Sequence, residues 1–483
     1  MEKPSLPAEI IEELPVDVRV YLAYLEESLK LLQAQVTNQQ NKITELEGQL
    51  KLNSQNSSKP PSSDPPSAPP RPAKKKSGKK RGGQIGHTRH TRQLVPVEKV
   101  NEVKEWWPTK CTNGECGKGL RPRDQVGEAI RQQVWEIVLN PVVVTEHQLY
   151  ACECSECGRV SRAQTSGEVP RGMFGPQLVA AVASLHGRFR LTEREIVAVV
   201  EGLWGLELSL GSVADMCEKA SSALAEVYEE AQKQIPKEQK LNLDETSWKK
   251  GKKKHWLWVA VSRLVVLFHL DEKRDSAAFR KIVGEEYEGV VSSDRFRSYS
   301  GLEAEKHQWC WAHLIRDFRR MSERAGPGGI WGEEALELSR QLFEEWQEYR
   351  QSAGKMSLQE LKDALAPIRT DFKQLLEEGK THEDGAVRSL CGELNKAEAS
   401  LWVFSEVAGV EPTNNTAERA LRPAVIWRKR CFGSQSEGGL RFVERMLTVA
   451  ATLKQQGRDL IEFVTHALKA KWFGQPTPSL VQV

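Results

Sequence analysis

The sequence has no long hydrophobic run and no excess of charge of one sign. Its longest apolar stretch, residues 256–270, is broken by Ser262 and Arg263 and is too short to span ~30 Å of hydrocarbon. The first ten residues carry neither the basic nor the apolar segment of a secretory signal. These absences argue against a secreted or membrane-embedded chain, so we expect a cytoplasmic protein without membrane contact.

Cysteine is scarce, and five of the nine cysteines fall between residues 111 and 157. In a reducing cytoplasm thiols do not form disulfides, so such a cluster indicates a metal site. Cys111 and Cys116 form a C-x4-C pair, Cys154 and Cys157 form a C-x2-C pair, and a glycine follows each pair. The pattern predicts a structural Zn²⁺ ion held by these four thiolates. Cys152 competes with Cys154 as a ligand, and buried cysteines without metal are the alternative.

Residues 130–150 lie between the two cysteine pairs and are rich in Val, Trp, Thr and Gln, with stretches of alternating polarity. This pattern predicts two or three strands that bring the pairs together. We therefore expect a zinc-binding β module over residues 94–170.

Positive charge is concentrated in one stretch, although the net charge of the whole chain is only +3. Residues 71–93 contain nine Lys or Arg and no acid, so the rest of the chain carries a net −6. Residues 53–72 are mostly Ser, Asn and Pro, which predicts a disordered basic linker over 53–93. We expect its cations to bind DNA phosphates, with a solubilising tail as the alternative; they are Lys74, Lys75, Lys76, Lys79, Lys80 and Arg81.

Apolar residues recur at spacings of three and four near the N-terminus, which predicts a coiled coil over residues 18–52 and hence self-association. They are Leu22, Leu25, Leu29, Leu32, Val36, Ile43, Leu46 and Leu50. Gln39 interrupts this seam and would set its register. The alternative is a helix that lies on the protein's own core.

Residues 171–238 are expected to form several short helices. Thr192 followed by Glu195 predicts a capping box at the start of one of them, and a turn at Gly205 separates it from the next. Two helices joined in this way form either a DNA-binding helix-turn-helix or a connector that packs on the next domain, and the sequence favours neither.

The region after residue 240 has the pattern of an RNase H-like α/β core within a multidomain α+β protein. Strands are expected at 241–246, 255–261, 264–270 and 289–294, and a helix at 275–283. The lysine-rich turn 249–254 separates the first two strands. In the RNase H-like order the first and fourth strands are neighbours, so Asp244 and Asp294 would converge.

A third carboxylate is available on a later helix, which the residues around Glu418 are expected to open. Two aspartates on adjacent strands and one glutamate on a facing helix could hold two Mg²⁺ or Mn²⁺ ions for phosphodiester chemistry, because these hard cations prefer carboxylate oxygens. The core would then comprise residues 239–320 and 411–483, separated by a helical insertion over 321–410.

Basic residues flank all three acids. We expect them to contact DNA phosphates, with an ordinary solvated surface as the alternative. They are Lys252, Lys253, Lys254, Arg419, Arg422, Arg428 and Lys429.

Several strings resemble the insertion-sequence-66 family of bacterial DDE transposases over nearly the full length. The resemblance rests on Asn53-Ser54-Gln55-Asn56-Ser57-Ser58-Lys59-Pro60-Pro61, Gly82-Gly83-Gln84 with Gly86-His87, the four cysteines, Asp244-Glu245-Thr246 and Asn414-Asn415-x-Ala417-Glu418-Arg419-x-Leu421-Arg422-Pro423. It implies that Asp244, Asp294 and Glu418 are the metal-binding triad of DNA cleavage and strand transfer. It also implies a bacterial, nucleoid-associated protein that acts on double-stranded element ends and target DNA, as a homo-oligomer and with accessory proteins of the same element.

The same resemblance draws attention to Cys310-Trp311-Ala312-His313. A short strand is expected to end here and a helix to begin at His313, where a helix N-terminus favours anions. The family implies a supporting catalytic role for His313 near the scissile phosphate. A core cysteine followed by a surface histidine is the alternative.

Two other functions fit parts of the sequence. A catalytically silent DNA-binding regulator would retain the fold, but loss of the triad would have favoured it and all three acids are present. An RNase H-like DNA nuclease would need neither the cysteine pairs nor the coiled coil.

Overall fold

The computed structural model describes residues 15–51, 94–109, 115–116, 118–124, 126–135, 141–153, 155, 157, 160–165, 167, 169–170, 172–324 and 326–482. No helix in these ranges combines the length and the hydropathy needed to cross a bilayer. The chain is a mixed α+β protein with one five-stranded sheet and many helices.

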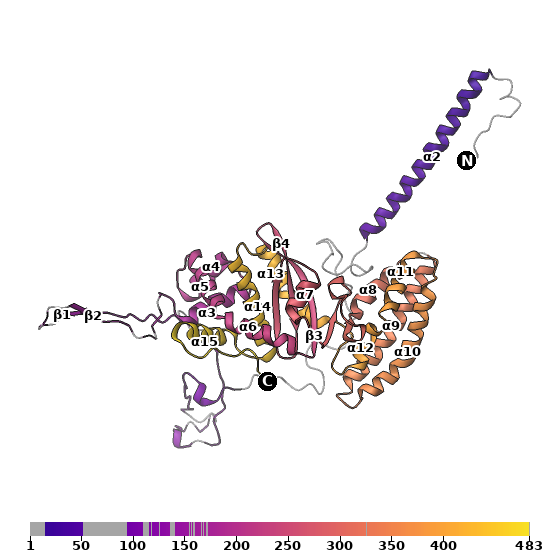
Figure 1. The fold of residues 1–483 in the computed structure, drawn as a ribbon. Coiled ribbons are helices and arrows are strands. Elements are labelled where there is room, and N and C mark those ends of the chain that lie inside the picture. The colour runs from indigo at the N-terminus through magenta and orange to yellow at the C-terminus, as the bar shows by residue number, and fades with distance from the viewer. Residues whose placement is uncertain are drawn as a thin grey trace. The chain divides into compact units, whose positions relative to one another are not determined.

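The five-stranded sheet has the order β5-β4-β3-β6-β7. Figure 1 labels two of its strands, β3 and β4. Its strands are β3 (Lys240–Lys250), β4 (Lys253–Val261), β5 (Val266–Asp271), β6 (Val290–Ser293) and β7 (His307–Trp309). Strands β3, β4 and β5 pair antiparallel, whereas β6 runs parallel to both β3 and β7. The predicted meander and the predicted pairing of the first and fourth strands are therefore confirmed.

The hairpin between β3 and β4 is tighter than the expected turn over 249–254. The ladder continues to the Lys250–Lys253 pair, which leaves only Gly251 and Lys252 in the turn. Gly251 has φ +55°, a conformation that a residue with a Cβ rarely adopts. The Gly251 N–H also donates to the carbonyl of Ser434 at 2.8 Å, which anchors the hairpin tip.

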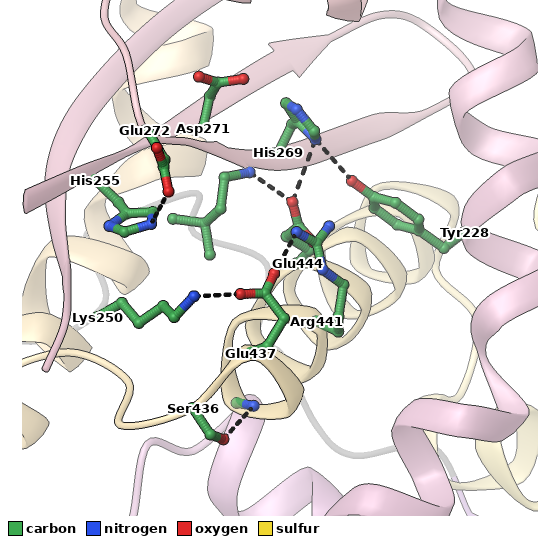
Figure 2. Close-up of polar contacts among 12 residues, drawn as sticks. Tyr228, Lys250, His255, His269, Asp271, Glu272, Ser436, Glu437, Arg441 and Glu444 are labelled. Carbon is green, nitrogen blue, oxygen red and sulfur yellow. Dashed lines mark hydrogen bonds and ion pairs between the residues drawn. The ribbon is translucent and has the colours of Figure 1, made fainter. Parts of the chain in front are cut away.

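Helix α14 (Glu437–Gln456) closes the outer edge of the sheet with side chains. An edge strand leaves every second N–H unpaired, and here Leu270, Phe268 and Val266 of β5 donate to Glu444 Oε1 (2.6 Å), Thr448 Oγ1 (2.9 Å) and Thr452 Oγ1 (3.0 Å). Four helical residues rise about 6 Å and two strand residues about 6.6 Å, so the two repeats match. Figure 2 shows Glu444 between β5, His269 and Arg441.

The stretch between the sheet and the Glu418 helix is helical, as predicted. It contains α8 (Trp311–Ser322), α9 (Pro327–Gln351), α10 (Leu358–Gly379), α11 (Gly385–Lys396) and α12 (Ala399–Glu406). These helices share one core around Trp311, Phe318 and Phe372, whose rings lie in contact. The helix α7 (Ser276–Val283) precedes β6 and is capped by Asp275.

The predicted short helices before the sheet are also present. They are α3 (Pro176–Gly187), α4 (Glu193–Trp204), α5 (Leu210–Ala223) and α6 (Ala225–Gln234). The capping box is confirmed, since Thr192 N–H donates to Glu195 and Glu195 N–H donates to Thr192. Helix α5 buries one face against α3, α14 and α15 (Leu460–Phe473). A connector and a helix-turn-helix would both bury one face in this way, so the two alternatives stay open.

Short 3₁₀ turns and an N-terminal helix complete the elements away from the site. In the part of the chain that the structure describes, the 3₁₀ turns are η2 (Val97–Lys99), η3 (Pro122–Asp124), η4 (Ile235–Lys237), η5 (Arg297–Tyr299) and η6 (Ala304–Lys306). Helix α2 (Val16–Lys51) covers the expected coiled-coil segment up to residue 51, and Leu25, Leu29, Leu32 and Val36 are exposed on it. Its self-association stays a prediction.

The predicted strands over 130–150 are wrong for the described parts of that stretch, 130–135 and 141–150, which contain no strand. A short hairpin follows instead, made of β1 (Ala151–Glu153) and β2 (Val160–Arg162). Alternating polarity needs a core to cover one face, and Ile130 and Val143 are fully or largely exposed. The side-chain amide of Gln133 bonds the N–H and C=O of Val95, where a strand would have used its backbone.

The zinc site and the basic arm remain predictions. Cys111 and Cys154 lie outside the described residues, while Cys116, Cys152 and Cys157 carry exposed free thiols. The arm cations Lys74, Lys75, Lys76, Lys79, Lys80 and Arg81 also lie outside the described residues.

Candidate active site

Parallel pairing of β3 and β6 places Asp244 and Asp294 side by side. Asn242 lies opposite Ser292 in this ladder, and each aspartate follows two residues later. Because side chains alternate along a strand, the aspartates point to the same face, and neighbouring strands lie about 4.8 Å apart. The predicted convergence of these two acids follows from this register.

The carboxyl group of Asp244 lies in a negatively charged environment. Burial, together with the charges of Glu245, Asp294 and Glu418, raises the pKa of Asp244 to about 8. The Glu245 N–H donates to Asp244 Oδ1 at 2.8 Å, which opposes this shift without cancelling it. The charges of Asp294 and Glu418 thus both act on Asp244, so the structure places the three acids near one another.

Glu418 lies near the two aspartates because the Asn414 side chain fixes the start of its helix against β3. The buried Asn414 side chain donates to the carbonyl of Leu243 at 2.5 Å and accepts from the Asn242 amide at 3.0 Å. Glu418 lies one turn later on α13 (Asn415–Cys431), and its N–H donates to the Asn414 carbonyl at 3.2 Å. One amide side chain therefore fixes the start of α13 against the strand that carries Asp244.

His313 approaches Glu418 from the first turn of α8. Its Nδ1 lies 3.7 Å from Glu418 Oε1, and a guanidinium nitrogen of Arg316 lies 3.9 Å from the same oxygen. Burial, followed by the charge of Arg316, lowers the pKa of His313, so the imidazole is neutral at pH 7. Both His313 Nδ1 and Glu418 Oε1 are buried atoms without a hydrogen-bond partner.

Glu245 and Arg274 form a second charged pair that sequence reasoning missed. Glu245 points to the opposite face of β3 from Asp244, and its buried carboxylate accepts from Arg274 Nε at 2.6 Å and from the Tyr299 hydroxyl. The same guanidinium lies 3.9 Å from Asp294 and stacks on the Phe296 ring. Arg274 lies in the loop between β5 and α7, where no local pattern of the sequence signals this role.

The buried side chain of His307 supports the backbone of Asp294 through Ser293. His307 Nδ1 accepts from the Trp309 indole N–H at 3.2 Å, because an indole nitrogen can only donate. The other ring nitrogen, Nε2, therefore carries the proton and donates to Ser293 Oγ at 2.8 Å. Ser293 in turn donates to the carbonyl of Asp294 at 2.8 Å.

Acidification should destabilise the protein through His307. Burial lowers the pKa of His307 to about 4, below the ordinary value of 6.5, so between these two values the unfolded chain binds more protons than the folded one. The contribution of His307 to the free energy of unfolding is fully present above pH 6.5 and decreases as the pH drops toward 4. We expect a loss of about 2 kcal/mol between pH 7 and pH 5, measured by urea denaturation with tryptophan fluorescence.

His307→Gln should remove this part of the pH dependence while keeping a donor and an acceptor. The matched control is His466→Gln, at an exposed position of α15, which should retain the wild-type slope. Equal slopes for wild type and His307→Gln would show that His307 does not carry the effect.

The three carboxylates fit divalent cations. Asp244, Asp294 and Glu418 offer hard oxygen donors, the kind that Mg²⁺ and Mn²⁺ bind. Glu418 Oε1 has no hydrogen-bond partner, and burial, followed by the negative charges of Glu245, Asp294 and Glu418, raises the pKa of Asp244. A bound cation would supply a partner for Glu418 Oε1 and would favour the ionised form of Asp244.

Cations continue along the same face of α13 as Glu418. Helical spacing places Arg419, Arg422 and Lys429 on one solvent-exposed stripe, and all three are exposed. Arg428 differs, because it donates to Thr246 Oγ1 at 2.9 Å and to Ser247, and so holds α13 on β3. The lysines Lys252, Lys253 and Lys254 are exposed at the hairpin tip.

Comparison with known proteins gives a family and two relatives. The family described as "Transposase IS66 family" matches residues 171–441, more than half of the chain, and a family of unknown function matches residues 1–93. Two uncharacterized proteins of Sinorhizobium fredii (strain NBRC 101917 / NGR234) are similar. Protein y4hP is 22% identical over 386 residues, which are 72% of this chain and 68% of the relative. Protein y4qI is 25% identical over 256 residues, which are 47% of this chain and 46% of the relative.

Proposed function

Because the chain belongs to the IS66 family of transposases, we propose that it cleaves DNA at the ends of an insertion sequence and joins them to target DNA. The observation that carries this proposal is the register of β3 and β6, which sets Asp244 and Asp294 on neighbouring strands, together with the Asn414 contact that fixes the start of the Glu418 helix to β3. The strand order supports an RNase H-like core for this chemistry.

Asp244, Asp294 and Glu418 would hold two Mg²⁺ or Mn²⁺ ions. Bound in this way, such ions activate an oxygen nucleophile and stabilise charge on the leaving oxygen of a phosphodiester. The three carboxylates would position the ions and balance their charge. Arg274 would reduce the repulsion between Asp294 and Glu245. Asn414 is a positioning residue, because it acts through the backbone of β3 and α13.

His313 and the cations on α13 would receive the DNA. A neutral imidazole can donate or accept one hydrogen bond at a phosphate or at an attacking water, which suits a supporting role. Arg419, Arg422 and Lys429 would neutralise phosphates next to the cut, and Lys252, Lys253 and Lys254 would extend this surface. Arg428 would contribute from within the fold, through its contacts with Thr246 and Ser247.

The other segments would serve assembly on DNA. We propose the division set out from the sequence: a coiled coil over 18–52 that pairs protomers, a basic linker over 53–93 and a zinc module over 94–170 that grip element ends, and a helical segment over 171–238 that is either a helix-turn-helix or a connector. The core of residues 239–320 and 411–483 would then cleave the DNA, and residues 321–410 form an insertion between its two parts. The substrate would be double-stranded bacterial DNA in the cytoplasm, and accessory proteins of the element would be further partners.

The purified full chain should cut DNA that carries the ends of its element, and it should need Mg²⁺ or Mn²⁺ to do so. We expect end-labelled DNA to be nicked at the element boundary and joined to target DNA with either ion, and neither product to form with EDTA. The products can be separated on denaturing gels and sequenced across the new junctions.

The same assay separates the alternatives. Binding of element ends without cleavage in either ion would contradict the proposal and support a silent regulator. Cleavage without a preference for element ends and without joining would also contradict it and support a nuclease. A scrambled end sequence of equal length is the control.

A further inference from the structure

A second set of metal-binding donors shares Glu418 with the three carboxylates described above. The thiol of Cys310, the imidazole of His313 and the carboxylate of Glu418 each offer one donor atom, and these atoms lie within 4.8 Å of one another. Two of the three residues lie outside the carboxylate set described above. This set combines sulfur, nitrogen and oxygen, which a site built for Mg²⁺ would not.

The fold brings these donors together through the starts of two helices. Cys310 precedes the first residue of α8, and His313 follows three residues later on the same helical face. The N–H of Asn414 donates to Cys310 Sγ at 3.1 Å, which joins the start of α13 to the start of α8. Glu418 then lies one turn into α13 and faces His313.

Two of the three donor atoms lack a hydrogen-bond partner, as free metal ligands would. His313 Nδ1 and Glu418 Oε1 are buried and make no hydrogen bond, although they lie only 3.7 Å apart. Two ligands at about 2.0–2.1 Å from one tetrahedral cation lie roughly 3.4 Å from each other. The observed separation is therefore close to what a shared metal ion requires and too long for a direct hydrogen bond.

We propose that Cys310, His313 and Glu418 form a site for a thiophilic divalent cation such as Zn²⁺, separate in its donor chemistry from the Mg²⁺ set. Thiolate and imidazole select zinc over magnesium, and three protein ligands leave a fourth position for water. On binding, the thiol proton passes to solvent and the thiolate bonds the metal. The Asn414 N–H supplies the hydrogen bond to sulfur that commonly orients a metal-bound thiolate.

Sharing Glu418 makes the two sites compete. A carboxylate that is bound to zinc beside His313 is withdrawn from the aspartates, so micromolar-range zinc would inhibit a magnesium-dependent reaction. This consequence, unlike the binding itself, rests on the proposed function.

Cobalt substitution tests the binding directly. Co²⁺ reports thiolate ligation through a sulfur-to-metal charge-transfer band, and bound cobalt can be counted after gel filtration. We expect the wild-type full chain to bind one more Co²⁺ than Cys310→Ser, and to show a correspondingly stronger band. Any cobalt held by the cysteines of residues 111–157 is common to both proteins and cancels in the difference.

Two further variants keep the test decisive if Cys310→Ser folds poorly. His313→Ala, at a partly exposed position, and Glu418→Gln should each weaken this cobalt site at least about tenfold. Cys391→Ser, which removes a buried thiol in α11, is the matched control and should bind as much cobalt as wild type. Equal cobalt counts and equal bands in wild type, Cys310→Ser and His313→Ala would overturn the proposal.

The counting needs no DNA, so its outcome is independent of the proposed function. If wild type binds the additional cobalt but never cuts element ends, the metal site stands and the transposase proposal fails. If wild type cuts in Mg²⁺ but binds no additional cobalt, the transposase proposal stands and this site fails.

Discussion

Asp244→Asn should lose DNA cleavage by at least about 10³-fold while the protein becomes more stable. The substitution keeps the shape of the side chain but removes one charge and the metal-binding character of the carboxylate, which is worth several kcal/mol in the transition state. In the metal-free protein, however, the carboxylate of Asp244 is buried beside three other acids. Its neutralisation should raise the unfolding free energy at pH 7 by on the order of 1–3 kcal/mol.

The opposite signs of the two effects separate a catalytic role from a structural one. Cleavage is measured on labelled element ends, binding of the same DNA by mobility shift, and stability by thermal melting without divalent metal. Asp363→Asn makes the same chemical change on an exposed face of α10 and should leave all three unchanged. Near-normal cleavage by Asp244→Asn would refute the assignment, as would a loss of cleavage that merely follows a loss of folding.

Glu444→Ala should lower the free energy of unfolding by about 3–5 kcal/mol. The carboxylate is fully buried and accepts from the Leu270 N–H, while Arg441 and His269 lie within ion-pair distance (Figure 2). Its removal leaves a buried N–H unsatisfied and takes from Arg441 its buried partner, so that Arg441 keeps only the exposed Glu437. Breaking a buried pair from one side typically has an effect of this size. Urea denaturation of the full chain, followed by fluorescence and circular dichroism, measures the change.

Two variants on helix α14 serve as controls for this result. Glu437→Gln removes an exposed carboxylate that also bonds Arg441, and it should cost less than about 1 kcal/mol because solvent screens the pair. Thr448→Val removes only the acceptor for the Phe268 N–H and should cost about 1–3 kcal/mol. If Glu444→Ala were no more damaging than Glu437→Gln, the buried carboxylate would not hold the edge of the sheet.

The local pattern of the sequence was enough to predict the strands and helices around the site. Alternating polarity located β3 and an almost continuous apolar run located β4, and the resemblance read from the Asn414–Pro423 string is confirmed by the IS66 family match. The extension of β3 to Lys250 was missed because lysines are poor indicators of a strand, although here they pair across a hairpin. Periodicity describes one segment at a time, so it succeeds where a segment's own pattern decides its structure.

Contacts between distant segments were not predictable in this way. The Asn414 side chain donates to the carbonyl of Leu243, 171 positions earlier. The sequence of neither segment indicates that the other is its partner. The Arg274–Glu245 pair is hidden for the same reason. The stripe of Glu444, Thr448 and Thr452 did carry a signal, since polar residues at every fourth position of an otherwise apolar helix face must find acceptors or donors inside.

The failed strands over 130–150 show the reverse case. Their pattern is that of a half-buried sheet, but Val143 and Val144 are both largely exposed in the described part of this stretch. A pattern can specify which face would be buried without supplying anything to bury it against. Here the surroundings, and not the periodicity, decide the structure.

Both outer strands of the five-stranded sheet are already covered by helices, β5 by the side chains of α14 and β7 by α12, where the Phe404 N–H donates to Gln308 Oε1 at 2.8 Å. A sheet finished in this way cannot be lengthened by a strand from another polypeptide, so higher-order complexes cannot grow from it by backbone pairing. In the described residues around this sheet, protomers would instead dock through helices and loops, whose surfaces can be re-engineered without disturbing the sheet beneath the three acids.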